Sequence, residues 1–234
     1  METLIFDCDG VLVDSEAIAE AVIVQRLGEW LPDIQPAAML RQALGMTTAA
    51  ILEHIERHSA HSLPSDALLR IESDIEKHLE RDLQAIEGVL EAVAELRLPL
   101  AIVSNSSRRR VQASLANTGL LETLLGEAPL FTADQVERPK PAPDVYLLAA
   151  RSLNSEPRDC LVVEDSVSGV TAAHAAGMTV IGFTGASHIE PGHGERLKQV
   201  GAWRVLQRMW DLDGLIQQWR ESRSQACARR DDAR

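Results

Sequence analysis

Short runs of apolar, β-prone residues recur along the chain and predict six strands. Four are clear and two are weaker, and they lie at Leu4–Phe6, Leu98–Val103, Cys160–Val163 and Thr179–Phe183, then at Leu130–Phe131 and Arg204–Leu206. Between most of them apolar residues recur at helical spacing, at Val89–Leu96, Arg109–Ala116, Asp144–Leu153 and Ser168–Ala176. Nearly continuous apolar strands that alternate with helices indicate an α/β fold with a doubly wound, mostly parallel sheet covered on both faces.

One stretch breaks this alternation. Between about Ser15 and Leu83 there is no convincing strand, only amphipathic helical segments near Glu16–Glu29, Ala37–Ala43, Thr47–His58 and Ser65–Arg81. We therefore predict a small all-α cap domain over residues 15–84, inserted after the first strand of a core domain made of residues 1–14 and 85–220. Residues 221–234 are polar and charged without apolar periodicity, which predicts a flexible tail.

Composition limits the classes of partner. The chain has 234 residues, of which 45% are hydrophobic and 25% charged, and a formal net charge of −12. So acidic a chain is not expected to bind nucleic acid or a membrane surface, because both are anionic. The first residues lack a secretion signal and no run is apolar enough to span a bilayer, so we expect a cytosolic protein. We also expect a monomer.

The three cysteines point to no special chemistry. Cys8, Cys160 and Cys227 are odd in number and widely spread, without the paired spacing of a disulfide framework or a zinc site. Cys8 lies between two acids, whose charges oppose formation of a thiolate.

Polar clusters follow four of the predicted strands. They are Asp7-Cys8-Asp9-Gly10, Ser104-Asn105-Ser106, Lys140 after a loop, and Glu164-Asp165-Ser166. The carboxyl ends of parallel strands share one edge of a sheet, so these clusters are expected to converge on one crevice. Taken alone, an Asp-x-Asp-Gly sequence is equally compatible with an ordinary turn.

The residue types in these clusters suit phosphate chemistry. Several carboxylates at one buried edge would repel one another, and a bound divalent cation would relieve that repulsion. Mg²⁺ is the expected ion, because it favours few carboxylates, several waters and a substrate phosphate. Lys140 supplies a positive charge, and Ser104 and Asn105 supply neutral hydrogen-bond donors, so the set predicts a cradle for a phosphoryl group.

Four motifs in order resemble the haloacid dehalogenase superfamily, in its phosphatase branch with a helical cap. They begin at Asp7, Val103, Lys140 and Val162, and read Asp-Cys-Asp-Gly-Val-Leu-Val-Asp-Ser-Glu, Val-Ser-Asn, Lys-Pro-Ala-Pro-Asp and Val-Val-Glu-Asp-Ser-Val-Ser-Gly-Val. The resemblance covers about residues 3–185 and implies a Mg²⁺-dependent phosphatase that hydrolyses a small phosphorylated metabolite through an aspartyl-phosphate.

The resemblance also implies a role for each motif residue. Asp7 would be the nucleophile, and Asp9 would protonate the leaving alkoxide and then deprotonate the attacking water. Asp7, the backbone carbonyl of Asp9 and Asp165 would hold Mg²⁺, with Glu164 close by or acting through water. Ser104 and Lys140 would bind the transferring phosphoryl oxygens.

Other activities are weighed against this one. Dehalogenases lack an acid at the position of Asp9 and need no metal, so carbon–halogen hydrolysis is not expected. Phosphomutases related to β-phosphoglucomutase are similar across all four motifs, but carry a cap histidine and a cap arginine where alignment on Asp9 and Gly45 gives Ala19 and Thr48. A non-catalytic sensor of phosphorylated metabolites is a third possibility, although every catalytic position is intact.

Three further segments bear on the substrate and on the crevice. Asp82–Gly88 is similar to bacterial sugar-phosphate phosphatases that prefer 6-phosphogluconate, which gives a lead to the substrate. Arg108-Arg109-Arg110 is interpreted as a solvated first helical turn near the phosphate site. Gly185–His188, after the fifth strand, is equally compatible with a border of the crevice and with a surface loop.

Overall fold

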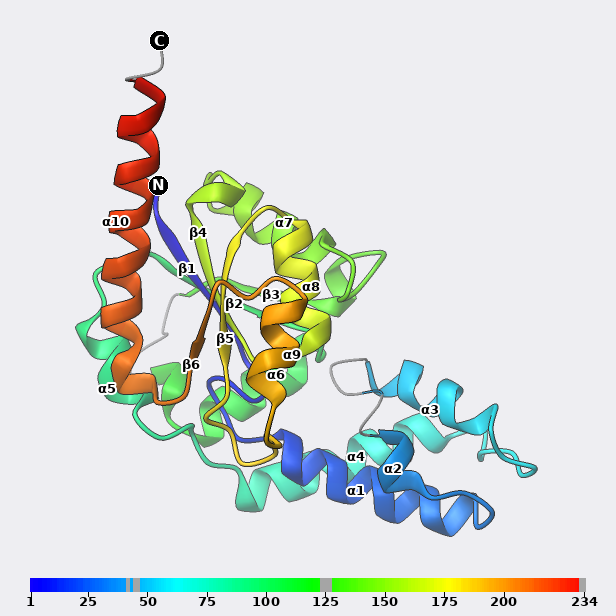
Figure 1. The fold of residues 1–234 in the computed structure, drawn as a ribbon. Helices are drawn as coiled ribbons and strands as arrows, with labels where there is room; N and C mark the ends of the chain where they lie inside the picture. Colours follow the sequence, from blue (N-terminus) through cyan, green and yellow to red (C-terminus); the bar gives the residue numbers. More distant parts are fainter. Residues whose placement is uncertain (41–42, 44–46, 123–127, 232–234) are drawn as a thin grey trace.

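A six-stranded parallel sheet forms the centre of the protein (Figure 1), as seen in a computed structural model. The structure describes residues 1–40, 43, 47–122 and 128–231, the last six of them by backbone alone. The strand order is β3-β2-β1-β4-β5-β6, with every neighbouring pair parallel. The strands are β1 Thr3–Asp7, β2 Leu100–Ser104, β3 Leu130–Thr132, β4 Cys160–Glu164, β5 Thr179–Phe183 and β6 Arg204–Leu206.

The predicted fold class is confirmed, and all six predicted strands are present within two residues of their expected ends. The reason lies in the burial of both sheet faces. Leu4 and Phe6 of β1 pack into one cluster of buried side chains while Ile5, between them, packs into another. Because neither face meets water, each strand is almost continuously apolar and is readable from the sequence.

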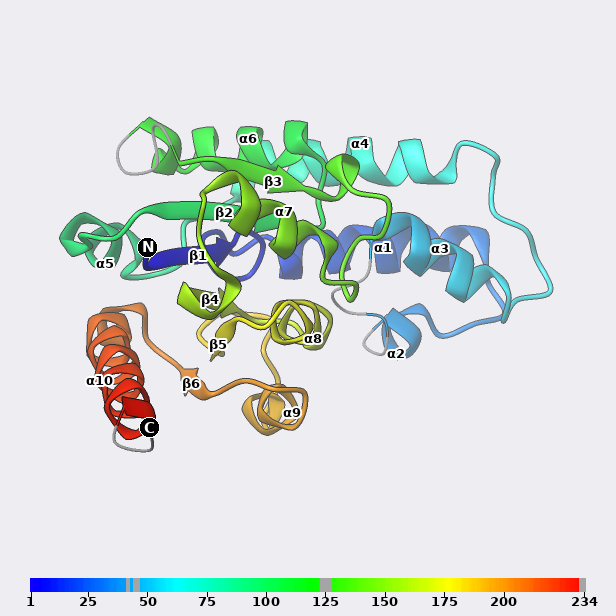
Figure 2. The ribbon, with the colours of Figure 1, turned by 90° about the horizontal axis from the view of Figure 1, so that it is seen from above.

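Helices cover both faces of the sheet (Figure 2). Apolar residues of α5, α6 and α10 belong to the first cluster, and those of α7, α8 and α9 to the second. These helices are α5 Val89–Glu95, α6 Arg108–Asn117, α7 Asp144–Ser152, α8 Val167–Ala175, α9 His193–Gln199 and α10 Leu212–Asp231. Helix α9 was not predicted, because its seven residues are mostly polar and only His193 and Leu197 are buried.

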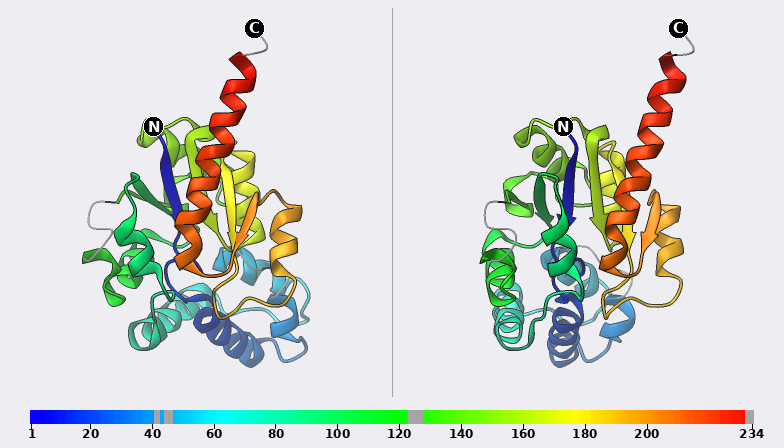
Figure 3. Two further views of the ribbon diagram at one scale, coloured as in Figure 1. Left: turned by 60° about the vertical axis from the view of Figure 1, so that its left-hand side comes forward. Right: turned by 90° about the vertical axis from the view of Figure 1, so that its left-hand side faces the viewer.

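Four helices follow β1 in the chain and precede α5. They lie together at the carboxyl edge of the sheet (Figure 3). They share a third buried cluster of their own and are α1 Glu16–Trp30, α2 Pro36–Leu40, α3 Thr48–Glu56 and α4 Ala67–Asp82. The two chain crossings pair through the backbone, since Asp14 N donates to Gln84 O at 3.0 Å and Ile86 N to Leu12 O at 2.9 Å. The division into a core and a cap over residues 15–84 stays a prediction.

Residues 221–231 continue α10 as a helix, although the sequence there has no apolar periodicity. The flexibility expected of residues 221–234 stays a prediction. Trp219 anchors this helix: its side chain is buried, and its indole Nε1 donates to Thr179 Oγ1 at 3.2 Å. One turn later Arg223 forms an ion pair with Asp159. Because Gln, Ala and Arg are good helix formers, a helix anchored in this way can continue without an apolar face. Residues 232–234 lie outside the described residues.

None of the helices in the described part of the chain combines the length and the apolar composition needed to cross a bilayer.

Candidate active site

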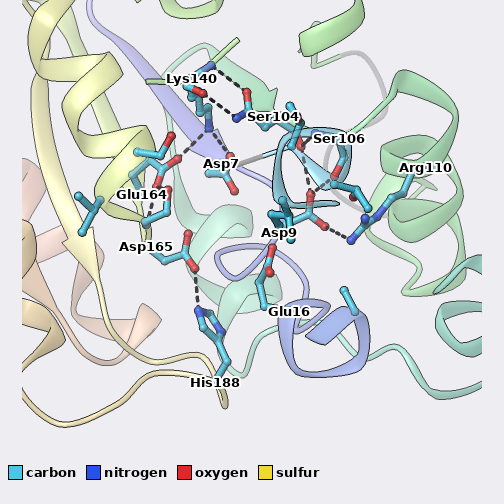
Figure 4. Close-up of a pocket in the computed structure, with 18 of the residues that line it drawn as sticks. Asp7, Asp9, Glu16, Ser104, Ser106, Arg110, Lys140, Glu164, Asp165 and His188 are labelled. Atoms are coloured by element: carbon cyan, nitrogen blue, oxygen red, sulfur yellow. Dashed lines mark hydrogen bonds and ion pairs between the residues drawn. The ribbon is translucent and has the colours of Figure 1, made fainter. Parts of the chain in front are cut away.

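The clusters that follow the strands meet at one edge of the sheet (Figure 4). Asp7 ends β1 and Glu164 ends β4, and Asp165 comes next in the chain. All three side chains are buried, and one carboxylate oxygen from each lies within 4.8 Å of the other two. The expected convergence of residues more than 150 positions apart is therefore observed.

Lys140 lies between two of these carboxylates. Its Nζ is 2.5 Å from Asp7 Oδ1 and 2.8 Å from Glu164 Oε1. The Lys140 side chain is only 2% exposed, so the ammonium group has little contact with water. The Tyr146 ring lies under it, with Nζ 5.0 Å from the ring centroid. Burial alone would lower the pKa of Lys140, but the charges of Asp7 and Glu164 outweigh it and raise that pKa well above its usual value.

Asn105 holds the Lys140 backbone in place. Its side-chain Nδ2 donates to Lys140 O at 3.2 Å, and its Oδ1 accepts from Lys140 N at 3.0 Å. The amide predicted to bind substrate is thus engaged with the segment that carries the lysine. A direct contact of Asn105 with substrate stays a prediction.

The Asp9 carboxylate lies outside the three-acid group and is surrounded by hydroxyls. Ser15 Oγ donates to Asp9 Oδ1 at 2.7 Å, and Ser104 Oγ and Ser106 Oγ donate to Oδ2 at 3.0 and 2.8 Å. Burial would raise the pKa of Asp9, but the nearby charge of Arg110 and these hydrogen bonds hold it below its usual value. Ser104, predicted to bind phosphate, is therefore bonded to Asp9 in this state.

Two glycines allow the acids to come this close. A Cβ at Gly10 would lie 2.1 Å from Asp165 Oδ2, and a Cβ at Gly169 would lie 1.6 Å from Glu164 Oε1. Gly10 also has a φ of +77°, which disfavours other residues. The second Glu164 oxygen accepts from Ser166 N at 2.7 Å and Ser166 Oγ at 3.0 Å at the start of α8.

The loop after β5 borders the site, because His188 lines the cavity. Of the two interpretations of Gly185–His188, the border of the crevice is therefore the correct one. His188 Nε2 lies 3.2 Å from Asp165 Oδ2, and its side chain is 7% exposed. Ser187 ties the loop to the cap crossing, because its N and Oγ donate to Asp14 Oδ1 at 3.2 and 3.0 Å. His193 at the start of α9 adds a 2.5 Å hydrogen bond from Nε2 to the Asp165 backbone carbonyl.

The segment Arg108-Arg109-Arg110 forms the first turn of α6 next to the cavity, as expected, but Arg110 is not solvated. Arg109 is 79% exposed and pairs with Glu76 of α4 at 2.5 Å. Arg108 instead donates to Leu130 O at 2.6 Å. Arg110 is 14% exposed and lies 3.5 Å from Asp9 Oδ1. Helical geometry turns every third or fourth residue to the same face, but which of three adjacent arginines faces the site cannot be read from the sequence.

A cavity of about 970 Å³ lies between the sheet edge and helices α1, α3 and α4. Its lining on the sheet side includes Asp7, Asp9, Ser104, Ser106, Arg110, Lys140, Glu164, Asp165 and His188, and on the helical side Glu16, Ala19, Thr48, Glu72 and Glu76 among others. A cavity of this size accommodates a small metabolite.

Comparison with known proteins gives this geometry a family. Residues 4–183 match the family described as haloacid dehalogenase-like hydrolase. The chain belongs to this family. The 6-phosphogluconate phosphatase of Escherichia coli (strain K12) is 28% identical over 192 residues, which cover 82% of this chain and 86% of the relative. The chain is thus a hydrolase of the haloacid dehalogenase type, and a phosphatase.

Two solved structures extend the match to most of the chain. A haloacid dehalogenase-like protein from Agrobacterium tumefaciens strain C58 is 41% identical, with a TM-score of 0.80 over 92% of this chain and 97% of that one. A hydrolase of the family from Deinococcus radiodurans R1, solved with bound phosphate and sodium, is 32% identical, with a TM-score of 0.72 over 94% and 96% of the two chains.

The acids of this haloacid dehalogenase-type phosphatase fit a hard divalent cation. Asp7, Glu164 and Asp165 supply only oxygen donors, which is the ligand type of Mg²⁺. Burial, together with the charges of neighbouring acids, raises the pKa of Asp7 well above its usual value and that of Asp165 above it, although Lys140 and His188 oppose the shifts. Carboxylates that resist ionisation when no cation is present are those that a cation would stabilise.

The fit of Gly169 against Glu164 is testable by stability. Gly169→Ala should lower the free energy of unfolding by roughly 2–4 kcal/mol, because the added Cβ displaces the Glu164 carboxylate from Lys140. Gly28→Ala in the last turn of α1 is the control, since nothing lies within 4 Å of its added Cβ. Gly28→Ala should raise the free energy of unfolding by about 0.5–1 kcal/mol. Urea unfolding of both variants measures the difference, and equal effects would contradict the close packing.

Glu16 should give the metal-free protein a recognisable pH dependence. Burial and the charges of Asp9 and Asp165 raise the pKa of Glu16 from 4.5 to about 7. Between these values the folded state keeps a proton that the unfolded chain releases, so this contribution makes stability fall as pH rises through the window. In urea unfolding with EDTA from pH 4.5 to 7, Glu16→Gln should fall less steeply than the wild type. Parallel curves would show that Glu16 titrates normally.

Proposed function

We propose that this protein is a Mg²⁺-dependent phosphomonoesterase that hydrolyses a small phosphorylated metabolite, of the sugar-phosphate or phosphogluconate type, through an aspartyl-phosphate. The observation that carries the proposal is the contact of Lys140 with Asp7 inside a group of three buried acids. This contact supports the proposal because phosphoryl transfer would need a nucleophilic carboxylate, a fixed positive charge and a cation-binding group of acids at one point.

Asp7 would act first. A carboxylate oxygen of Asp7 attacks phosphorus while the bond to the ester oxygen breaks, and Lys140 offsets the charge of the phosphoryl oxygens and orients Asp7. Mg²⁺ held by Asp7, Asp165 and the Asp9 carbonyl, with Glu164 nearby, would supply further neutralisation of phosphate charge. The Ser104 hydroxyl, which donates to Asp9 in the structure, would turn to the phosphoryl group.

Asp9 would carry the proton in both halves of the reaction. Its carboxylate is favoured in the absence of substrate, the form that can take a proton from the attacking water. An arriving phosphate is negative and would raise the pKa of Asp9, which favours the protonated form that the leaving alkoxide needs. Water then attacks the aspartyl-phosphate, Asp9 accepts its proton, and phosphate leaves with Asp7 restored.

The substrate class rests on relatives and on the cavity. The E. coli relative acts on 6-phosphogluconate by name, and the segment Asp82–Gly88 resembles phosphatases with that preference. The cavity offers both Arg110 and several acids to a polar, hydroxylated substrate. The cytosol as the site of action and a monomeric state stay predictions.

The phosphomutase alternative is not favoured by the two aligned cap positions, which lie on the wall of the cavity. Ala19 and Thr48 both line it, and neither carries the charge that could hold a second phosphate. Gly45, on which that alignment depends, lies outside the described residues. A sensor without turnover is distinguished by the experiment below.

The role of Asp7 is tested by Asp7→Asn. Removing the nucleophile should lower kcat for p-nitrophenyl phosphate at least about 10³-fold, because the amide cannot form the covalent intermediate. Asp213→Asn, on the exposed face of α10, makes the same chemical change away from the site and should keep wild-type activity. Normal turnover by Asp7→Asn would refute the nucleophile, and a wild type that binds phosphate esters without turnover would favour the sensor.

The role of the cation is tested by its removal. EDTA should abolish phosphate release from p-nitrophenyl phosphate, and excess Mg²⁺ should restore it fully, because the three acids repel one another and the substrate without a cation. Ca²⁺ should restore it poorly, since it prefers longer bonds and more ligands. Full activity in EDTA after dialysis would contradict a metal requirement.

A further inference from the structure

Arg110 is the arginine of its cluster that lies against Asp9, whereas Arg109, which also lines the cavity, pairs with Glu76. Arg110 projects from the first turn of α6, lines the cavity and approaches Asp9. In Figure 4 it comes to Asp9 from the side away from Lys140 and Glu164. The acid that serves the ester oxygen thus has the phosphoryl-binding lysine on one side and Arg110 on the other.

Among the described residues, the Arg110 guanidinium makes one long contact with Asp9 and leaves its Nε without a partner. Its contact with Asp9 Oδ1 is 3.5 Å, beyond the usual range of a charged hydrogen bond. Asp9 already accepts three shorter hydrogen bonds from serine hydroxyls. Arg110 Nε is buried and, within the described part of the chain, has no hydrogen-bond partner. A buried donor left without a partner is costly, so the geometry provides a place for an acceptor that arrives with the substrate.

The position of Asp9 tells which part of the substrate would meet Arg110. Asp9 must touch the ester oxygen to protonate it, so a group beyond Asp9 on the side away from Lys140 faces the alcohol part of the ester. The acceptor for Arg110 therefore belongs to the leaving group and not to the transferred phosphoryl group.

A single negative charge suits this position best. A planar guanidinium binds a carboxylate through two parallel hydrogen bonds, and Nε with a terminal nitrogen offers that edge. A second phosphate would bring more negative charge into a cavity that is also lined by Glu16, Glu72 and Glu76. These acids can instead accept hydrogen bonds from hydroxyl groups.

We propose that Arg110 is a specificity-determining residue that pairs with a carboxylate in the leaving group, so that the preferred substrates are phosphorylated hydroxy acids such as sugar acids. This inference rests on the proposed phosphatase activity and narrows its substrate class.

The test compares matched pairs of esters that differ in one carboxylate. The pairs are 6-phosphogluconate with sorbitol 6-phosphate, and 3-phosphoglycerate with glycerol 3-phosphate, each measured as kcat/KM with Mg²⁺. The wild type should prefer the acid in at least one pair by about 10- to 100-fold, the value of a charged hydrogen bond. Arg110→Gln should reduce that ratio toward one, whatever it does to each rate, and Arg110→Lys should restore it only partly.

Arg108→Gln is the matched control, because it removes a charge from the same helical turn whose guanidinium donates to Leu130 O and does not line the cavity. It should keep the wild-type ratio within about twofold. If Arg110→Gln lowers kcat equally for both members of a pair, Arg110 only positions Asp9 and the proposal is overturned. A preference for fructose 1,6-bisphosphate over fructose 6-phosphate that depends on Arg110, without one for acids, would overturn it in favour of a second phosphate.

The failure of the inference can be told apart from that of the proposed function. A wild type that hydrolyses both members of each pair equally well refutes the role of Arg110 and leaves the phosphatase intact. A wild type that releases phosphate from none of the four esters, nor from p-nitrophenyl phosphate, refutes the phosphatase activity and the inference with it.

Discussion

The structure depends on the balance of one buried ammonium group against several buried carboxylates. Lys140 contacts Asp7 and Glu164 where none of the three side chains has appreciable access to water. Uncompensated charges at such a depth would be very costly, and the acids outnumber the lysine. Much of the surrounding architecture maintains this arrangement: Gly169 makes room for Glu164, Ser166 occupies its second oxygen, and Asn105 holds the lysine backbone.

The same imbalance separates the site into two regions with different tasks. The three-acid group with Lys140 is ready for a cation and a phosphoryl group. Asp9 stands apart, saturated by serine hydroxyls and flanked by Arg110, in surroundings that favour its ionised form. Both regions are built from the ends of neighbouring parallel strands. Asp7 at the end of β1 and Asp9 two residues later therefore lie in different environments.

The sheet and the convergence of the four motifs could be predicted from the sequence, since strands buried on both faces are apolar throughout and parallel strands deliver their ends to one edge. Features that depend on packing of polar segments were not predictable. Helix α9 has only two buried residues, and the helical continuation of α10 depends on the distant anchor of Trp219 on Thr179. His188 and Arg110 reach the site through the course of a loop and the rotation of one helix, for which the sequence carries no periodic signal.

Ser15 connects Asp9, the acid proposed to carry the proton, with the start of α1. It precedes α1 directly and donates to Asp9, while its neighbour Asp14 holds the loop that carries His188. A rotation of the helices about this crossing would therefore break the hydrogen bond from Ser15 to Asp9. The same movement would shift the loop whose His188 contacts Asp165. Asp9 would then keep only the hydroxyl donors of Ser104 and Ser106, so the orientation of its carboxylate toward an attacking water would depend on where the helices stand.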